Sequence, residues 1–218
     1  MNKLNILEEP GLYVITDITM AGKRQYIEIV RDILMGECRI IEIRDRVTPF
    51  ENLVAIGKVL KSLTAEYGAL LIIDGNPYLA REVGADGIHL GPNDIPIDIA
   101  QEIVGPECLI GLSTHTIREM TRTIITQDVD YITLGPIFSA AGDPPDLQTI
   151  SLRVLKWAAD NVPFPVVAVG GINVDNISRV VSTGMKCIGV QSAVMKAPDM
   201  ITASKELSDI IRKQYNPS

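Results

Sequence analysis

The feature that most restricts the fold of this 218-residue chain is an eightfold alternation of short apolar runs with helix-like runs. The apolar runs predict strands at residues 11–16, 39–43, 69–73, 86–90, 108–112, 130–134, 165–169 and 187–190. Helix-like runs follow at residues 24–35, 49–67, 77–83, 97–104, 117–126, 150–160, 173–184 and 200–213. Strict alternation implies parallel strands with right-handed crossovers, and eight such units close a (β/α)8 TIM barrel. We therefore predict a single TIM-barrel domain over residues 1–218. An open doubly wound sheet is the alternative, weakened because no G-x-G-x-x-G follows the first strand.

The seventh and eighth units, residues 165–195, contain a Gly-rich turn directly after a buried apolar run. Gly170 and Gly171 leave backbone N–H groups uncovered, and the start of a following helix adds more of them. Gln191 and Ser192 follow the eighth run in the same way. In TIM barrels a phosphate site commonly lies after strands seven and eight, so we predict a phosphate cradle here. The alternative is a tight turn without a ligand.

Composition and charge exclude several classes of protein. The formal net charge is −7 and there is no basic block, which argues against nucleic-acid binding. No apolar run is long enough to span a membrane, and the N-terminus lacks the apolar core of a signal peptide. We therefore expect a cytoplasmic protein that binds neither nucleic acid nor membrane. Cys38, Cys108 and Cys187 lack metal-type spacing and are expected to be buried free thiols.

Polar residues gather at the ends of the predicted strands, which is the catalytic face of a TIM barrel. They are Thr16, Glu42, Arg44, Asp74, Asn76, Asn93, Asp94, Ser113, His115, Gly135, Gly171 and Ser192. A purely structural chain would not be expected to gather ionisable groups at so many of these positions. The pattern therefore predicts a binding or catalytic site at this face.

Six segments in this order resemble the superfamily of thiamine phosphate synthase and its TenI-type thiazole tautomerase relatives. They are YVITD (13–17), IEIRDR (41–46), GADGIHLGPNDIP (84–96), GLSTHT (111–116), DYITLGPIF (130–138) and VAVGGINVDN (167–176). Together they cover most of the chain. The resemblance implies a TIM barrel, a role in thiamine assembly, and a thiazole phosphate held by the Gly-rich turns.

Compared with the synthases, this chain departs from the implied pattern at three places. The synthases join an aminopyrimidine diphosphate to a thiazole phosphate, release pyrophosphate and use Mg²⁺. Their Gln-x-Arg-x-Lys stands here as Glu42, Arg44 and Arg46. Gly75 replaces an Asp that ligates the metal, although Asp94 keeps the second acidic position. The loop 139–149, SAAGDPPDLQT, has no Lys or Arg for the diphosphate.

The TenI-type pattern matches these positions more closely. It implies Arg-x-Arg on the second strand, a Gly in place of the metal-binding Asp, and a His after the fifth strand. Arg44, Arg46, Gly75 and His115 match it. The implied reaction moves a proton and a double bond on a thiazole carboxylate phosphate, which requires an acid/base group. Histidine is the residue type suited to this near neutral pH, so His115 could serve without a metal.

We therefore predict a TenI-like, metal-independent enzyme acting on a thiazole phosphate, with His115 as its catalytic acid/base. Two alternatives are a thiamine phosphate synthase, with Mg²⁺ on Asp94, and a non-catalytic binder of thiazole or thiamine phosphate. No other cofactor is expected, and homo-oligomerisation is left open. The predicted substrate-binding residues are Glu42, Arg44, Arg46, Asp74, Asn76, Ser113, Gly135, Gly170, Gly171, Gln191 and Ser192.

For several of these residues a structural role is also open. His115 could be a structural histidine, and Arg44 could belong to an ion network with Glu42 or Asp74. Glu42 could orient the arginines or accept a hydrogen bond from an amino group. Asp94 could simply cap a turn. His89, between two apolar residues, is expected to be a satisfied core histidine.

Overall fold

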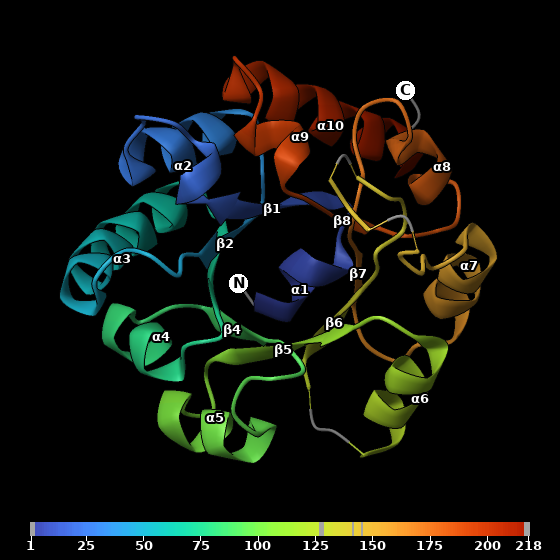
Figure 1. Cartoon of the computed structure of the whole chain (residues 1–218), viewed down its shortest axis with the longest axis horizontal. Coiled ribbons are helices and arrows are strands. Elements are labelled where there is room, and N and C mark those ends of the chain that lie inside the picture. Colours follow the sequence, from blue (N-terminus) through green and yellow to red (C-terminus); the bar gives the residue numbers. More distant parts are fainter. Residues whose placement is uncertain (1–2, 127–128, 141, 145, 216–218) are drawn as a thin grey trace.

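Eight parallel strands close into a barrel in the computed structural model, which describes residues 3–126, 129–140, 142–144 and 146–215 (Figure 1). Each strand pairs with the next one along the chain, and β8 pairs with β1 to close the circle. The strands are β1 (Gly11–Asp17), β2 (Ile40–Arg44), β3 (Leu70–Asp74), β4 (Gly87–Leu90), β5 (Leu109–Thr114), β6 (Tyr131–Leu134), β7 (Val166–Ala168) and β8 (Cys187–Val190). The prediction of a (β/α)8 TIM barrel is confirmed.

The helices form an outer ring because each buries an apolar stripe against the outward side chains of the strands. They are α2 (Tyr26–Met35), α3 (Phe50–Glu66), α4 (Pro77–Val83), α5 (Ile97–Val104), α6 (Ile117–Thr126), α7 (Leu152–Asn161), α8 (Ile177–Val181) and α10 (Met200–Tyr215). Among the described helices, none combines the length and apolarity that crossing a membrane requires. The three cysteines are buried and free, as expected.

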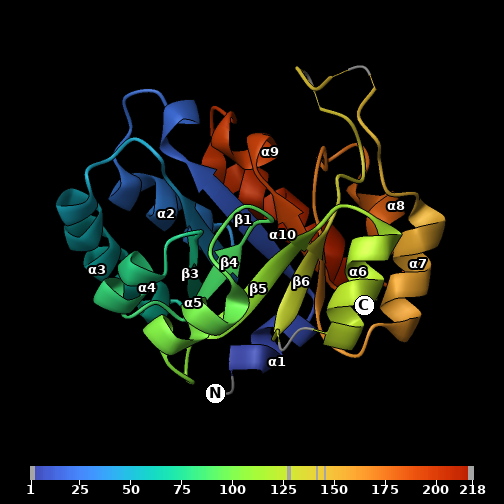
Figure 2. The same cartoon turned by 60° about the horizontal axis from the view of Figure 1, so that its bottom comes forward.

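The amino-terminal end of the barrel is closed by a helix that the sequence pattern did not predict. This helix, α1 (Lys3–Glu8), lies across the barrel end opposite the strand-to-helix loops (Figures 1 and 2). Its Ile6 and Leu7 are buried in the interior cluster with side chains of the strands. Six residues are too few to show helical periodicity, so the sequence pattern could not predict this helix. Its role, which is to cover the apolar interior at this end of the barrel, is apparent only in the structure.

Helix ends agree with the sequence in some places and differ in others. Pro77 occupies the first turn of α4, and the hydroxyl of Thr116 accepts the N–H of Glu119 at 3.1 Å, as expected of a cap. Helix α8 is shorter than the predicted run 173–184, because it begins only after Asn176 and ends at Val181. A short additional helix, α9 (Ser192–Met195), follows β8 directly.

Candidate active site

The carboxyl ends of the strands meet at the barrel end opposite α1, called the mouth below. Because all eight strands are parallel, every residue that follows a strand reaches this one end. The predicted site residues therefore come together around the mouth, although they are spread over 150 residues of sequence. They divide into an arginine side at β2 and β3 and a glycine side at β7 and β8.

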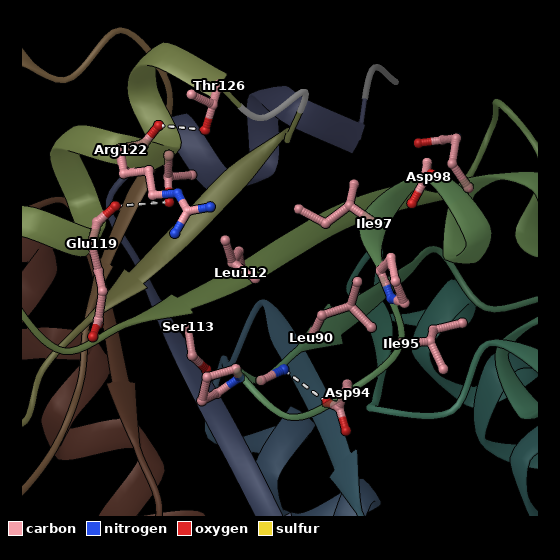
Figure 3. Close-up of a pocket in the computed structure, with 15 residues that line it drawn as sticks. Leu90, Asp94, Ile95, Ile97, Asp98, Leu112, Ser113, Glu119, Arg122 and Thr126 are labelled. Atoms are coloured by element: carbon pink, nitrogen blue, oxygen red, sulfur yellow. Dashed lines mark hydrogen bonds between the residues drawn. The ribbon is translucent and has the colours of Figure 1, made fainter.

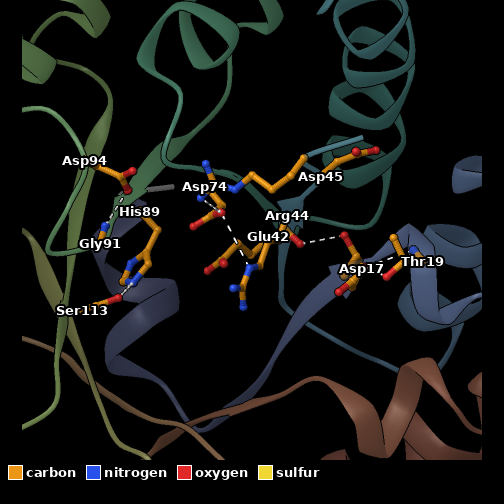
Figure 4. A network of polar contacts seen from close by, with 12 residues as sticks. Asp17, Thr19, Glu42, Arg44, Asp45, Asp74, His89, Gly91, Asp94 and Ser113 are labelled. Atoms are coloured by element: carbon orange, nitrogen blue, oxygen red, sulfur yellow. Dashed lines mark hydrogen bonds and ion pairs between the residues drawn. The ribbon is translucent and has the colours of Figure 1, made fainter. Parts of the chain in front are cut away.

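On the arginine side, Arg44 and Arg46, the arginine pair, project next to Asp74 at the end of β3 (Figure 4). Arg46 Nη2 donates to Asp74 Oδ2 at 2.6 Å, whereas Arg44 Nε lies 3.9 Å from the same oxygen. Both arginine side chains are more than half exposed. Burial and the nearby Glu42 raise the pKa of Asp74, and the two arginines oppose that shift. The ion network considered for Arg44 exists, but most guanidinium donors of the two arginines have no partner among the described residues.

Glu42 lies deeper than the sequence indicated. It is only 2% exposed, inside the barrel, and no ion pair joins it to an arginine among the described residues. Its Oε2 instead accepts the hydroxyl of Tyr13, whose oxygen lies 3.3 Å from the hydroxyl of Tyr131. Burial raises the pKa of Glu42 to about 7, although the Tyr13 hydrogen bond and the arginine pair lower it. The expectation that Glu42 orients the arginines by pairing with them is wrong for this arrangement.

This buried carboxyl makes stability depend on pH in a definite direction. Because its folded-state pKa is raised, the stabilising contribution is complete below the unfolded pKa and is lost as pH rises through about 7. Glu42→Gln keeps an acceptor for Tyr13 but cannot ionise. Urea unfolding should therefore find the variant close to wild type at pH 5 and about 2–3 kcal/mol more stable at pH 9. A stability difference that is the same at both pH values would contradict the burial argument.

His89 and Ser113 form a second polar contact, on the neighbouring strands β4 and β5. His89 Nε2 lies 2.9 Å from Ser113 Oγ, so the predicted binding residue Ser113 is held by a buried ring. Burial lowers the pKa of His89 to about 4, so the ring is neutral at pH 7. His89 Nδ1 is buried and has no hydrogen-bond partner among the described residues. The expectation of a fully satisfied core histidine is therefore wrong for one of its two nitrogens.

His115 is exposed at the mouth and fixed by its backbone and ring. Its Nδ1 lies 3.0 Å from the carbonyl oxygen of Gly135, and its backbone N–H donates to Glu119 Oε2 at 2.7 Å. A carbonyl can only accept, so Nδ1 carries the proton and the neutral ring keeps Nε2 as an acceptor. Gly135 thus contributes its carbonyl to the orientation of His115. Asn76 is engaged similarly, because its side-chain oxygen caps α4 through Leu79 N–H at 3.0 Å.

On the glycine side, Gly170 and Gly171 have φ values of 96° and 64°, which L side chains rarely adopt. A Cβ on Gly170 would lie 2.5 Å from Pro136 Cα, and one on Gly171 would lie 2.2 Å from Phe138 O. Together with Gln191 and Ser192 they form the glycine cradle. In the described part of the chain, no acceptor takes the backbone N–H of any of these four residues. All four residues are partly exposed, and grouped backbone N–H donors that a ligand can reach suit an anion.

The loop after β6 brings acid rather than base to the mouth. Asp143 accepts the backbone N–H of Ala140 at 2.7 Å, and Asp146 is exposed. Of the loop residues 139–149, Ala141 and Pro145 lie outside the described residues. Among those described there is no cation that could hold a diphosphate.

The acidic residues near Asp94 fit a metal ion only in part. In the described ranges, no three His, Cys, Asp or Glu side chains are grouped as metal ligands. Asp94 Oδ2 accepts the backbone N–H of Gly91 at 2.7 Å, which is the turn-capping role considered for it. A Cβ on Gly75, at φ 68°, would lie 3.0 Å from both Asp94 Oδ2 and Arg46 Nη2. One carboxylate is enough only for an Mg²⁺ that also binds the phosphates of a substrate.

A groove of about 820 Å³ opens beside the mouth, between α5 and α6. Figure 3 shows Asp94 and Ser113 at one end of it and Arg122 and Thr126 at the other. The groove therefore adjoins the mouth on the side of β4 and β5.

Sequence reasoning missed the tyrosines beneath Glu42. A Cβ on Gly111 would lie 2.1 Å from the ring of Tyr131, so that glycine makes room for the tyrosine across the interior. The rings of Tyr13 and Tyr131 are 6.4 Å apart between centroids. The available signal was a glycine inside one strand and a tyrosine at the start of the next.

The sequence profile of the thiamine monophosphate synthase family matches residues 12–194. The chain belongs to that family. The sequence resemblance is confirmed at this level.

Two curated relatives of the family match over almost the whole chain. A thiamine-phosphate synthase of Pyrococcus furiosus is 38% identical over 210 residues, 96% of this chain and 99% of the relative. A thiamine-phosphate synthase of Dictyoglomus thermophilum is 36% identical over 214 residues, 98% of this chain and 96% of the relative. These names agree with the expectation of an enzyme. They support the synthase alternative more than the TenI-like prediction.

Solved structures agree with the family assignment. A thiamine phosphate pyrophosphorylase from Pyrococcus furiosus superposes with a TM-score of 0.86 at 38% identity, covering 99% of this chain and 98% of the other. A thiamine phosphate pyrophosphorylase from Bacteroides thetaiotaomicron, at 18% identity and a TM-score of 0.68, covers 94% and 97% and supports the fold alone.

Proposed function

We propose that this member of the thiamine monophosphate synthase family joins an aminopyrimidine diphosphate to a thiazole phosphate, forming thiamine phosphate and releasing pyrophosphate. Two relatives that are 36–38% identical to this chain, and that match it over nearly their full length, are named thiamine-phosphate synthase. The TenI-like function that the sequence favoured becomes the second candidate.

The observation that carries this proposal is that two separate sets of hydrogen-bond donors, each suited to an anion, lie at one mouth. The glycine cradle offers unpaired backbone N–H groups at β7 and β8, and the arginine pair offers guanidinium donors at the end of β2. Backbone donors suit a monophosphate, whereas two planar guanidinium groups can pair with a diphosphate. A reaction between two phosphorylated substrates needs one such group for each. The arginine pair would stabilise the negative charge that develops on the departing pyrophosphate.

Magnesium fits this proposal only as an ion that enters with the diphosphate. Asp94 is the one mouth carboxylate in the family position for it, and Gly75 contributes none. When bound, Mg²⁺ would neutralise part of the charge on the diphosphate oxygens. With a single carboxylate, we expect the affinity for Mg²⁺ alone to be weak.

A tautomerase is the second candidate because of His115. Within the described part of the chain its Nε2 has no hydrogen-bond partner, and it is the acceptor of the neutral ring, as proton abstraction requires. The acidic loop also supports this candidate, because Asp143 and Asp146 would repel a diphosphate. The third alternative, a binder without turnover, would show affinity for a thiazole phosphate and neither activity.

His115→Asn separates these candidates. Asparagine keeps a polar group near Gly135 but cannot titrate, so tautomerase turnover should fall by about 10²-fold or more. Synthase turnover should change by less than about tenfold, because the proposed chemistry is carried by the anion-binding groups. Purified wild type and variant are assayed for pyrophosphate release and for thiazole isomerisation. Wild type that isomerises but releases no pyrophosphate would overturn the synthase proposal.

A further inference from the structure

The carboxyl groups of Asp74 and Glu42 both lie near the arginine pair, but they differ in how far positive charge and hydrogen bonds offset their negative charge. Asp74 accepts Arg46 at 2.6 Å and lies 3.9 Å from Arg44. Glu42 has only the Tyr13 hydroxyl, on Oε2, and no donor among the described residues contacts its other oxygen. The negative charge of Glu42 is therefore balanced through space, by guanidinium groups that Asp74 already uses.

An anion bound by the arginine pair would disturb this balance. An anion that draws Arg46 toward itself weakens the contact between Arg46 and Asp74. The anion also adds negative charge close to both carboxyl groups. Two neighbouring carboxylates that lose their shared cation cannot both stay ionised in a buried setting, so one of them takes a proton. Glu42 is the more buried of the two, and among the described residues it has no ion pair with an arginine, whereas Asp74 has two.

None of the titratable side chains near Glu42 takes up that proton near pH 7, so we expect Glu42 to accept it. Tyr13 and Tyr131 are buried phenols whose pKa values are raised well above the usual range, so they stay protonated. Burial lowers the pKa of His89 to about 4, so this ring stays neutral near pH 7. Among the described residues, the charged and titratable groups that interact with Glu42 are Tyr13 on β1, Arg44 and Arg46 on and after β2, Asp74 on β3 and Tyr131 on β6. His89 on β4 lies beside Tyr131, with 5.6 Å between the ring centroids.

We infer that Glu42 is a positioning residue that couples the binding of an anionic substrate at the arginine pair to the uptake of a proton. Protonated Glu42 no longer attracts the two guanidinium groups through space, whereas ionised Glu42 competes with the substrate for their positive charge. The inference rests on the proposed function in one respect, which is that the anion bound in the reaction is the diphosphate of the aminopyrimidine substrate. Affinity for that anion should therefore fall as pH rises above neutrality.

The test uses methanedisulfonate, which resembles a diphosphate in having two anionic groups on one bridging atom but does not titrate near neutrality. Calorimetric titration at pH 8, in two buffers of different ionisation enthalpy, gives the number of protons taken up. Wild type should take up between about half a proton and one proton, and its affinity should fall by at most about tenfold per pH unit. Glu42→Gln should take up almost none and bind with little pH dependence.

Glu51→Gln is the matched control, because it makes the same chemical change on an exposed residue of α3. It should behave as wild type. If Glu42→Gln folds poorly, a ¹³C carboxyl NMR titration of wild type replaces it, and the pKa of Glu42 should rise when the disulfonate binds. Binding without proton uptake, uptake that persists in Glu42→Gln, or no binding at all would overturn the inference. Because no turnover is measured, the result is independent of whether the synthase proposal holds.

Discussion

Replacing Arg44 by glutamine is expected to lower kcat/KM for thiamine phosphate formation by about 10²–10³-fold. Arg44 is more than half exposed at the mouth, and its 3.9 Å separation from Asp74 leaves its donors available to a substrate. Glutamine removes the positive charge and the planar fork that pairs with phosphate oxygens. Steady-state kinetics with the aminopyrimidine diphosphate varied measures this loss.

Arg39→Gln is the control for that experiment. Arg39 directly precedes β2, so it lies at the other end of the barrel, where it pairs with Glu9 at 2.6 Å. The same substitution there should leave kcat/KM within about twofold, because exposed ion pairs contribute little to stability. Arg44→Lys should recover only part of the loss. An Arg44→Gln enzyme with nearly normal kcat/KM would mean that the diphosphate binds elsewhere.

The second large effect is expected from Gly171→Ala, which should destabilise the protein by about 2–5 kcal/mol. The added methyl group would lie 2.2 Å from the backbone oxygen of Phe138, so the chain must shift. The φ of 64° adds about 1–2 kcal/mol of strain for an L residue. Affinity for a thiazole phosphate should fall as well, because the cradle amides move. Urea unfolding and calorimetric titration measure the two effects.

Gly22→Ala isolates the backbone strain from the clash. Gly22 has a nearly identical φ of 65°, but nothing lies within 4 Å of the position that a Cβ would take there. Its replacement should therefore cost only about 1–2 kcal/mol. Equal losses for the two variants would show that the contact with Phe138 does not hold the turn.

Short apolar runs were enough to predict all eight strands to within about two residues, because each strand is buried on both faces. The parallel order then brought the strand-end residues to one mouth without further information. The sequence could not show how deep in the barrel a side chain lies, whether at the exposed mouth or in the buried interior. Glu42 stands two residues before Arg44 yet points inside, next to Tyr13, a partner 29 residues away. The pairing of Arg46 with Asp74 across two strands is equally invisible in sequence spacing.

The preference between synthase and tautomerase shows a related limit. Gly75 and the acidic loop 139–149 pointed away from diphosphate chemistry. Relatives that match nearly the whole chain bear the synthase name instead. Gly75 lacks the carboxylate that the family resemblance implies at this position. The arginine pair on β2 nevertheless supplies positive charge at the same mouth. The outcome therefore depends on the whole charge arrangement at the mouth, which local motifs do not determine.

The most direct test of the two-anion mouth is a crystal structure of the protein with thiamine phosphate and pyrophosphate. The account predicts the monophosphate on the amides of the glycine cradle, near Gly170, Gly171 and Ser192. It predicts the pyrophosphate against Arg44 and Arg46, on the opposite side of the mouth. Pyrophosphate density away from both arginines, or a monophosphate away from the cradle, would contradict it.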